Sequence, residues 1–117
     1  VVTLNELQKL PLIIREQGSG SLEVITASLK KKNIKLSQLN VTMILKSSES
    51  IKSYLSHSTT FAFLSVHSIF KELKNYDLKI VDIQDLDIER YFYFITQQGD
   101  SHYLKDLFFK FINRDNL

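Results

Sequence analysis

The sequence predicts a single α/β domain in which helices cover a largely parallel β-sheet. Short β-branched or aromatic runs alternate along the chain with segments whose apolar residues recur at helical spacing. After a short N-terminal helical turn the order is β-α-β-α-β-α-β-β-α, with short loops and no internal repeat. Alternating units of this kind predict a sandwich with right-handed crossovers, and 117 residues suffice for one such domain.

The first half of the chain is predicted to hold a helical turn, two strands and one longer helix. Apolar residues recur at helical spacing over residues 4–10, until a proline ends the pattern. Residues 12–14 form a short β-branched run, and 41–45 form a continuous apolar run that is typical of a strand covered on both faces. Between them, 22–32 carry a helical apolar stripe, and Asn33 is placed to end that helix.

The second half is predicted to contain three more helices and three more strands. Their order is helix 51–55, strand 61–64, helix 66–73, strand 78–83, strand 91–96, and an amphipathic helix from about residue 101. The third strand is typical of a buried strand, 78–83 of an edge strand, and 91–96 has the strongest β signal. We expect the last helix, with Leu104, Leu107, Phe108 and Phe111, to pack on this domain or on another chain.

Composition excludes several classes of function. A net charge of +2 gives no strong electrostatic footprint for nucleic acid, and the absence of cysteine excludes disulfides, thiolate metal sites and thiol nucleophiles. No apolar run approaches the ~20 residues of a membrane-spanning helix, and the N-terminus does not resemble a signal peptide. The chain starts on a patterned segment without an initiator methionine, so we expect it to be a piece of a longer protein.

The loop Gly18-Ser19-Gly20-Ser21 joins the end of a predicted strand to the start of a helix. Open α/β sheets bind ligands at this edge, where free helix N–H groups meet exposed loops. The alternative is a tight turn in which a serine caps the helix, and residue chemistry alone slightly favours that turn. Ser48 and Ser65 follow the next two strands and strengthen the case for a cleft. The loop matches neither a Walker A motif nor a dinucleotide fingerprint.

Other reactive residues give no recognisable catalytic or metal site. His57, His67 and His102 lack the spacing of a helical ligand pair and are expected at the surface. The loop does not fit a G-x-S-x-G nucleophile elbow, and no carboxylate pair can be argued from spacing. We therefore predict no catalytic residue, no metal and no cofactor.

Three stretches of the chain resemble the effector-binding domain of LysR-type transcriptional regulators. LNELQKLPLIIREQGSGSLEVITASLKKKNI resembles the segment that opens the second half of that domain, with the pattern L-x-x-L-x-x-x-P-x-I-x-R-E-x-G-S-G-T-R. MILKSSESIKSYLSHSTTFAFLS is similar to the family's next strand, helix and strand, and LDIERYFYFITQQGDSHYLKDLFFKFI is similar to its closing section. The resemblance covers nearly the whole chain.

The resemblance implies a three-layer sandwich whose mostly parallel twisted sheet includes an antiparallel strand. This would be one lobe of a domain like the type 2 periplasmic binding proteins, spanning residues 1–117, with 91–117 as the closing strand and helix. A small effector binds between two lobes in such proteins. The first lobe and the helix-turn-helix DNA-binding domain would lie outside this chain, so DNA would be contacted only through the missing part. A cytoplasmic homodimer or tetramer without enzymatic activity is implied.

Carried over by position, the resemblance assigns an effector site to strand ends and helix starts. The residues are Gly18, Ser19, Gly20, Ser21, Ser48, Leu64 and Ser65. Arg15 and Glu16 would shape the loop rather than contact the ligand. Leu22 stands where the family commonly has arginine, and 56–60 lack the family's glycines, so the type of effector stays open. An anion would suit the helix N-termini.

Two other classes of function compete with this hypothesis. A solute-binding protein or stand-alone sensor could share the two-lobe fold, and a secretion signal in the full gene would favour it over a helix-turn-helix regulator. A small doubly wound enzyme would need an acid, base or nucleophile at the sheet edge, and the sequence offers none that can be named.

Overall fold

The computed structural model describes residues 1–88 and 92–98 of the chain. In chain order the elements are α1 (Leu4–Leu7), β1 (Leu12–Arg15), α2 (Gly20–Lys30), the 3-10 turn η1 (Leu36–Gln38), β2 (Val41–Leu45), α3 (Ser48–Leu55), β3 (Phe61–Ser65), α4 (Val66–Lys74), β4 (Leu78–Val81) and β5 (Phe92–Gln97). The first residue of the predicted strand 91–96 and the whole predicted closing helix lie outside the described residues. Within them, no helix is long and apolar enough to cross a membrane.

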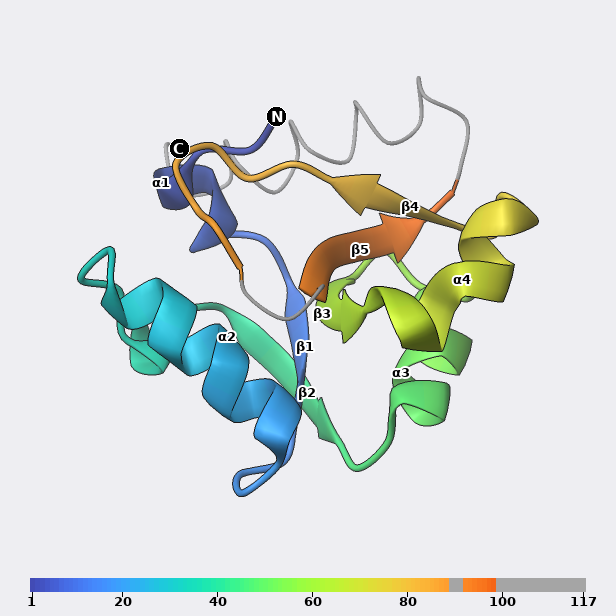
Figure 1. Cartoon of the computed structure of the whole chain (residues 1–117), viewed down its shortest axis with the longest axis horizontal. Coiled ribbons are helices and arrows are strands. Elements are labelled where there is room, and N and C mark those ends of the chain that lie inside the picture. Colours follow the sequence, from blue (N-terminus) through green and yellow to red (C-terminus); the bar gives the residue numbers. More distant parts are fainter. Residues whose placement is uncertain (89–91, 99–117) are drawn as a thin grey trace.

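The five strands form one mixed sheet in the order β2-β1-β3-β5-β4 (Figure 1). β1 runs parallel to both β2 and β3, whereas β5 runs antiparallel to both β3 and β4. The prediction of a mostly parallel sheet with one antiparallel strand is therefore confirmed. Because β1 and β3 lie next to each other although a whole β-strand separates them in sequence, the chain crosses over the sheet twice, with β2 outside β1.

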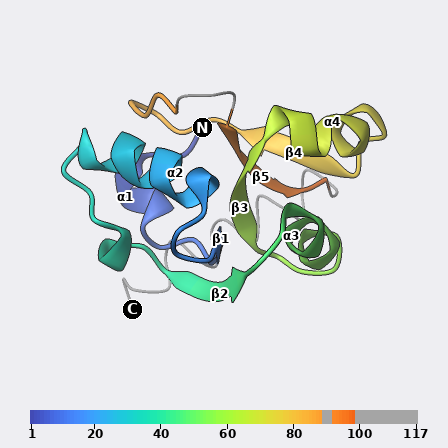
Figure 2. The ribbon, with the colours of Figure 1, turned by 60° about the horizontal axis from the view of Figure 1, so that its bottom comes forward.

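Helices cover both faces of the sheet, as a three-layer sandwich requires. α1 and α2 lie on one face, and α3 and α4 lie on the other (Figure 2). Successive residues of a strand point to opposite faces. Leu12 and Ile14 of β1 accordingly join the apolar cluster beneath α1 and α2, while Ile13 joins the one beneath α3 and α4. The cluster on the α2 face also contains the stacked rings of Phe61 and Phe94, 5.2 Å apart.

The helix boundaries follow from local hydrogen bonding. The predicted turn before Pro11 is α1, which begins with a capping box between Thr3 and Glu6. Asn33 has φ +60° after the end of α2, and the N–H of Ile34 donates to the carbonyl of Leu29 at 3.0 Å. This is the hydrogen-bond pattern with which a left-handed residue ends a helix, so the assignment of Asn33 as the terminator is confirmed.

The expectation that both faces of the strand at 41–45 are covered is wrong. β2 is an edge strand whose residues alternate between half-buried and exposed, and Ile44 keeps 59% of its surface exposed. A run of β-prone residues indicates a strand, but its neighbours are set by the strand order of the whole sheet. By contrast, β3 is buried in the middle of the sheet and β4 lies at the opposite edge, as predicted.

Candidate functional site

The carboxyl ends of the three parallel strands meet at one edge of the sheet. The register pairs Arg15 at the end of β1 with Leu45 at the end of β2, and it pairs Ile13 with Ala62 of β3. Each of these strands leads directly into a helix: β1 into α2, β2 into α3 and β3 into α4. The helices therefore start along a single edge, where their first N–H groups lack partners within the helix.

A serine caps each of the three helices at this edge. The Oγ of Ser19 accepts a hydrogen bond from the N–H of Leu22 at 3.1 Å, and the Oγ of Ser47 accepts from Ser50 at 3.1 Å. The Oγ of Ser65 accepts from the N–H of His67 at 3.2 Å. Capping is thus a structural role for Ser19 and Ser65, both of which we had predicted in the effector site. A hydroxyl that accepts in this way can still donate its own hydrogen to a ligand.

Two further serines that we predicted at the edge do not cap a helix. Ser21 and Ser48 lie in the first turns of α2 and α3, are half-buried, and make no side-chain hydrogen bond within the described residues. The sequence left open whether Ser47 or Ser48 caps α3, and the cap is Ser47. Ser21 and Ser48 are consequently the hydroxyls at this edge that are most available to a ligand.

The two glycines of the loop differ in what the backbone requires of them. Gly18 has φ +90°, a conformation that residues with a Cβ rarely adopt. Gly20 is the first residue of α2 and has no such φ, and a Cβ built on it would have no atom within 4 Å. The turn therefore explains Gly18, whereas the fold leaves Gly20 unexplained.

The side chain of Leu64 does not lie at the surface of this edge. It is 2% exposed and packs with Ile51 and Ile69 in the apolar cluster beneath α3 and α4. Leu22, which stands where the family commonly has arginine, is also buried, in the cluster on the α2 face. The side chain of Leu64 is therefore not available to a ligand, which corrects its assignment to the effector site.

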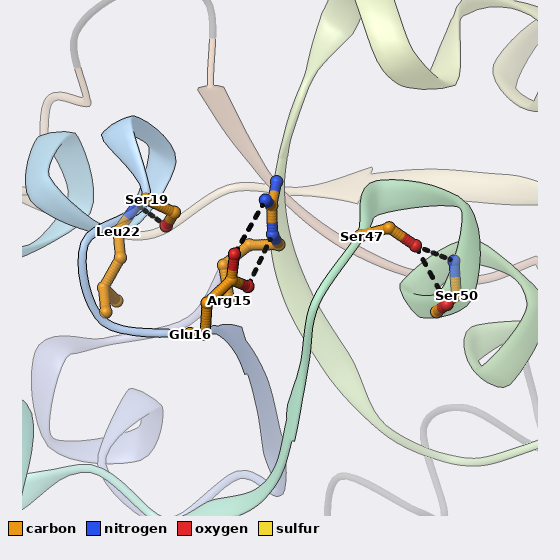
Figure 3. A network of polar contacts seen from close by, with 6 residues as sticks. All are labelled: Arg15, Glu16, Ser19, Leu22, Ser47 and Ser50. Carbon is orange, nitrogen blue, oxygen red and sulfur yellow. Dashed lines mark hydrogen bonds and ion pairs between the residues drawn. The ribbon is translucent and has the colours of Figure 1, made fainter.

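An ion pair between neighbouring residues stands at the end of β1. The Nε of Arg15 donates to one carboxylate oxygen of Glu16 at 3.2 Å and Nη2 donates to the other at 3.2 Å. The hydrogen bond from Arg15 lowers the pKa of Glu16, and the charge of Lys46, which follows β2, acts in the same direction. Figure 3 shows this pair in view between the caps of α2 and α3. The edge therefore carries two cations and one carboxylate at these positions.

The histidines are the remaining residues that the sequence offered for catalytic or metal chemistry. His57 and His67 are both exposed, on α3's C-terminal side and on α4 respectively, and His102 lies outside the described residues. No group of three or more His, Cys, Asp or Glu side chains within the described ranges could hold a metal ion. The hydrogen-bond donors at this edge are serine hydroxyls, helix N–H groups, the guanidinium of Arg15 and the ammonium of Lys46.

Comparison with known proteins gives one family match over nearly the whole chain. The model of the LysR substrate binding domain matches residues 1–114. The chain is 29% identical over 98 residues to the HTH-type transcriptional activator CmpR of a Synechocystis strain, covering 84% of this chain and 31% of that protein. It is 34% identical over 101 residues to a probable RuBisCO transcriptional regulator of Thalassiosira pseudonana, covering 86% of this chain and 33% of that protein.

A third relative is the uncharacterized HTH-type transcriptional regulator MJ0300 of Methanocaldococcus jannaschii, 32% identical over 95 residues that cover 81% of this chain and 32% of the relative. All three relatives are named as transcriptional regulators. The chain spans about a third of the length of each of them.

Proposed function

This chain belongs to the LysR substrate-binding domain family, and from that premise we propose that it is the second, effector-binding lobe of a LysR-type transcriptional regulator. Its role is to bind a small molecule rather than to catalyse a reaction. The relatives are about three times longer than this chain, and two of them are named as helix-turn-helix regulators, which supports a DNA-binding domain and a first lobe in the same polypeptide. A regulator of this kind works in the cytoplasm, where its DNA is.

The observation that carries the proposal is the gathering of three serine-bearing helix starts at one sheet edge. Ser19, Ser47 and Ser65 open α2, α3 and α4, and Ser21 and Ser48 add unengaged hydroxyls beside them. Ligands of open α/β sheets bind outside the carboxyl ends of the strands. We place half of the effector site here, and the other half on the first lobe, because a small ligand is held by burying most of its surface.

The donors at this edge favour a small anion as the effector. Helix N-termini carry a partial positive charge and present N–H groups, and hydroxyls donate readily to negatively charged oxygens. Arg15 and Lys46 add positive charge near the end of β1. Leu22, which stands where the family commonly has arginine, is buried in the core and adds no charge to the edge.

Removal of single hydroxyls tests the proposal. We expect the full-length regulator to show a saturable rise in melting temperature with a small anion from a panel of sulfate, inorganic phosphate, acetate and malonate. Ser21→Ala and Ser48→Ala should each lower the affinity for that anion by at least about tenfold, since a hydrogen bond to a charged group contributes about 1.5–3 kcal/mol. Ser53→Ala, an exposed serine on α3 away from the edge, is the matched control and should bind as the wild type does. No response to any anion, or equal loss in all three variants, would contradict the proposal.

We further propose that the regulator is a homo-oligomer in which β2 meets a second copy. β2 is an edge strand with backbone groups that no described strand pairs, and Ile44 presents its side chain to solvent there. Proteins commonly protect such edges, and an apolar one is suited to association. Ile44→Lys should shift the mass measured by light scattering toward the monomer, whereas Ile80→Lys on the opposite edge strand should leave it unchanged. A wild-type monomer at all concentrations would refute the assembly.

A further inference from the structure

Lys52 joins α3 to α4 through the ammonium group at the end of a largely covered side chain. Its side chain is 12% exposed. The Nζ lies 2.8 Å from Oε1 of Glu49 on the same helix, 2.8 Å from Oε1 of Glu72 on α4, and 2.7 Å from the main-chain carbonyl oxygen of Ser68, also on α4. These three acceptors use all three donors of the ammonium group.

The contacts tie the last turn of α3, where Lys52 lies, to both the first turn and the last turn of α4. Ser68 lies in the first turn of α4, three residues after its cap Ser65, and Lys52 lies five residues after Ser47, the cap of α3. Beneath the ammonium, the helices share apolar contacts in the same cluster of the core. Apolar contact is non-directional and tolerates sliding of one helix along the other. The hydrogen bonds from Lys52 are directional and fix that relative position.

The cluster is poorly explained by stability alone. The second carboxylate oxygen of Glu72, Oε2, is buried and has no hydrogen-bond partner within the part of the chain that the structure describes. Burial lowers the pKa of Lys52, but the hydrogen bonds to Glu49 and Glu72 outweigh it and hold the pKa above its ordinary value. Lys52 therefore stays charged. Buried ion pairs of this kind often contribute no more stability than apolar residues of the same size.

We propose that Lys52 is a positioning residue of the effector site, which holds the start of α4 against α3 so that Ser48 and Ser65 face a bound anion at a fixed spacing. This inference rests on the proposed function, because the spacing matters only if both helix starts contact one ligand. Lys52 itself does not contact the ligand in this account. It acts through the two helices that it joins.

The test separates stability from affinity. The double variant Lys52→Met/Glu72→Met replaces both buried charges with apolar side chains of similar length, and Lys52→Met alone leaves the charge of Glu72 buried without its partner. The double variant leaves the net charge unchanged, and Lys74→Met, which removes an exposed lysine from α4, controls for the loss of one positive charge in Lys52→Met. For each full-length protein we would measure urea unfolding, then the affinity for sulfate, inorganic phosphate, acetate and malonate.

We expect the double variant to unfold at the same urea concentration as the wild type while its affinity for the responding anion falls about tenfold, a loss typical of weakened support around a site. Lys74→Met should leave both the urea concentration of unfolding and the affinity for the anion unchanged. A double variant with wild-type affinity would overturn the inference, since the cluster would then serve packing alone. A double variant that does not fold would also overturn it, because the cluster would be needed for the fold itself. A wild-type protein that binds none of the anions would refute the proposed function before any variant is compared, and the inference with it.

Discussion

Gly18 and Gly20 lie two residues apart in one loop, yet the backbone requires glycine only at the first of them. At φ +90°, a residue with a Cβ at position 18 would meet a steric cost of about 1–2 kcal/mol. At position 20 the φ is not in the left-handed region and the space around a Cβ is open. Alanine there should leave the fold intact and stabilise it by about 0.5 kcal/mol, because it restricts the unfolded chain.

The two substitutions add the same methyl group, so their difference isolates the backbone conformation. We expect Gly18→Ala to lower the free energy of unfolding by about 1–2 kcal/mol, which for a domain of this size is roughly 4–8 °C in melting temperature. Gly20→Ala should raise the melting temperature by about 2 °C. Urea and thermal unfolding followed by circular dichroism measure both. Equal destabilisation by the two variants would refute the conformation of the turn described above.

The same two variants also test whether the loop is only a turn or also binds the ligand. Position 20 begins α2, where backbone N–H groups would face an anion, so the methyl group of Gly20→Ala should obstruct the ligand although the protein is at least as stable. We expect a loss of anion affinity of about tenfold, comparable to the loss of one charged hydrogen bond. Unchanged affinity in Gly20→Ala would place the ligand away from this loop.

Three further predictions concern the helices. Ser47→Ala should lower the free energy of unfolding, measured in urea, by about 1 kcal/mol because α3 loses its cap, whereas Ser53→Ala in the last turn of the same helix should not. Tyr76→Gly should raise the free energy of unfolding by about 1 kcal/mol, because Tyr76 has φ +61° after the end of α4 and its side chain is 77% exposed. A lower free energy of unfolding in this variant would show that the tyrosine ring makes a stabilising contact. Burial raises the pKa of Glu72, but the hydrogen bond from Lys52 outweighs it and holds the pKa below the ordinary 4.5. The folded protein therefore binds this proton less readily than the unfolded chain, so the contribution of Glu72 is present above pH 4.5 and is lost as the pH falls below about that value. Glu72→Gln should flatten this part of the stability curve, and an unchanged acid limb would contradict the assignment.

The periodicity of the sequence was sufficient to predict most of the secondary structure. Each strand of the described sheet and each helix from α1 to α4 lies where apolar spacing had placed it, because burial of one face of an element leaves its period in the sequence. The start of α2 was found less well. The apolar stripe begins at Leu22, but the helix begins at Gly20, since the cap at Ser19 rather than the first buried residue sets the boundary.

What the sequence could not supply is information on which distant elements meet. The apolar run of β2 looks like that of a central strand, and its edge position depends on the order of all five strands. The cluster around Lys52 brings together residues that are 16 and 20 positions apart, on helices whose packing no local pattern specifies. A lysine next to a glutamate one turn away on a predicted helix is typical of a solvated pair, so its burial carried no sequence signal.

The residues of the candidate site could be predicted only in part. The residues that cap the helices following β1 and β3, Ser19 and Ser65, could be assigned to the edge from the α/β pattern and the family resemblance. Leu64 is the residue before the cap Ser65 in β3, and its side chain packs in the apolar cluster beneath α3 and α4. The ion pair of Arg15 with Glu16 at the same edge had been assigned to the shape of the loop, and its position beside the helix starts adds charge to the candidate site.

The most direct test of the central claim is a crystal structure of the full-length regulator in complex with the anion that raises its melting temperature. We predict density for the anion at the edge described here, within hydrogen-bonding distance of the backbone N–H groups of Gly20 and Ser21 and of the hydroxyl of Ser48. Its opposite side should contact the first lobe. An anion bound elsewhere, with this edge occupied by solvent or by another part of the protein, would contradict the account.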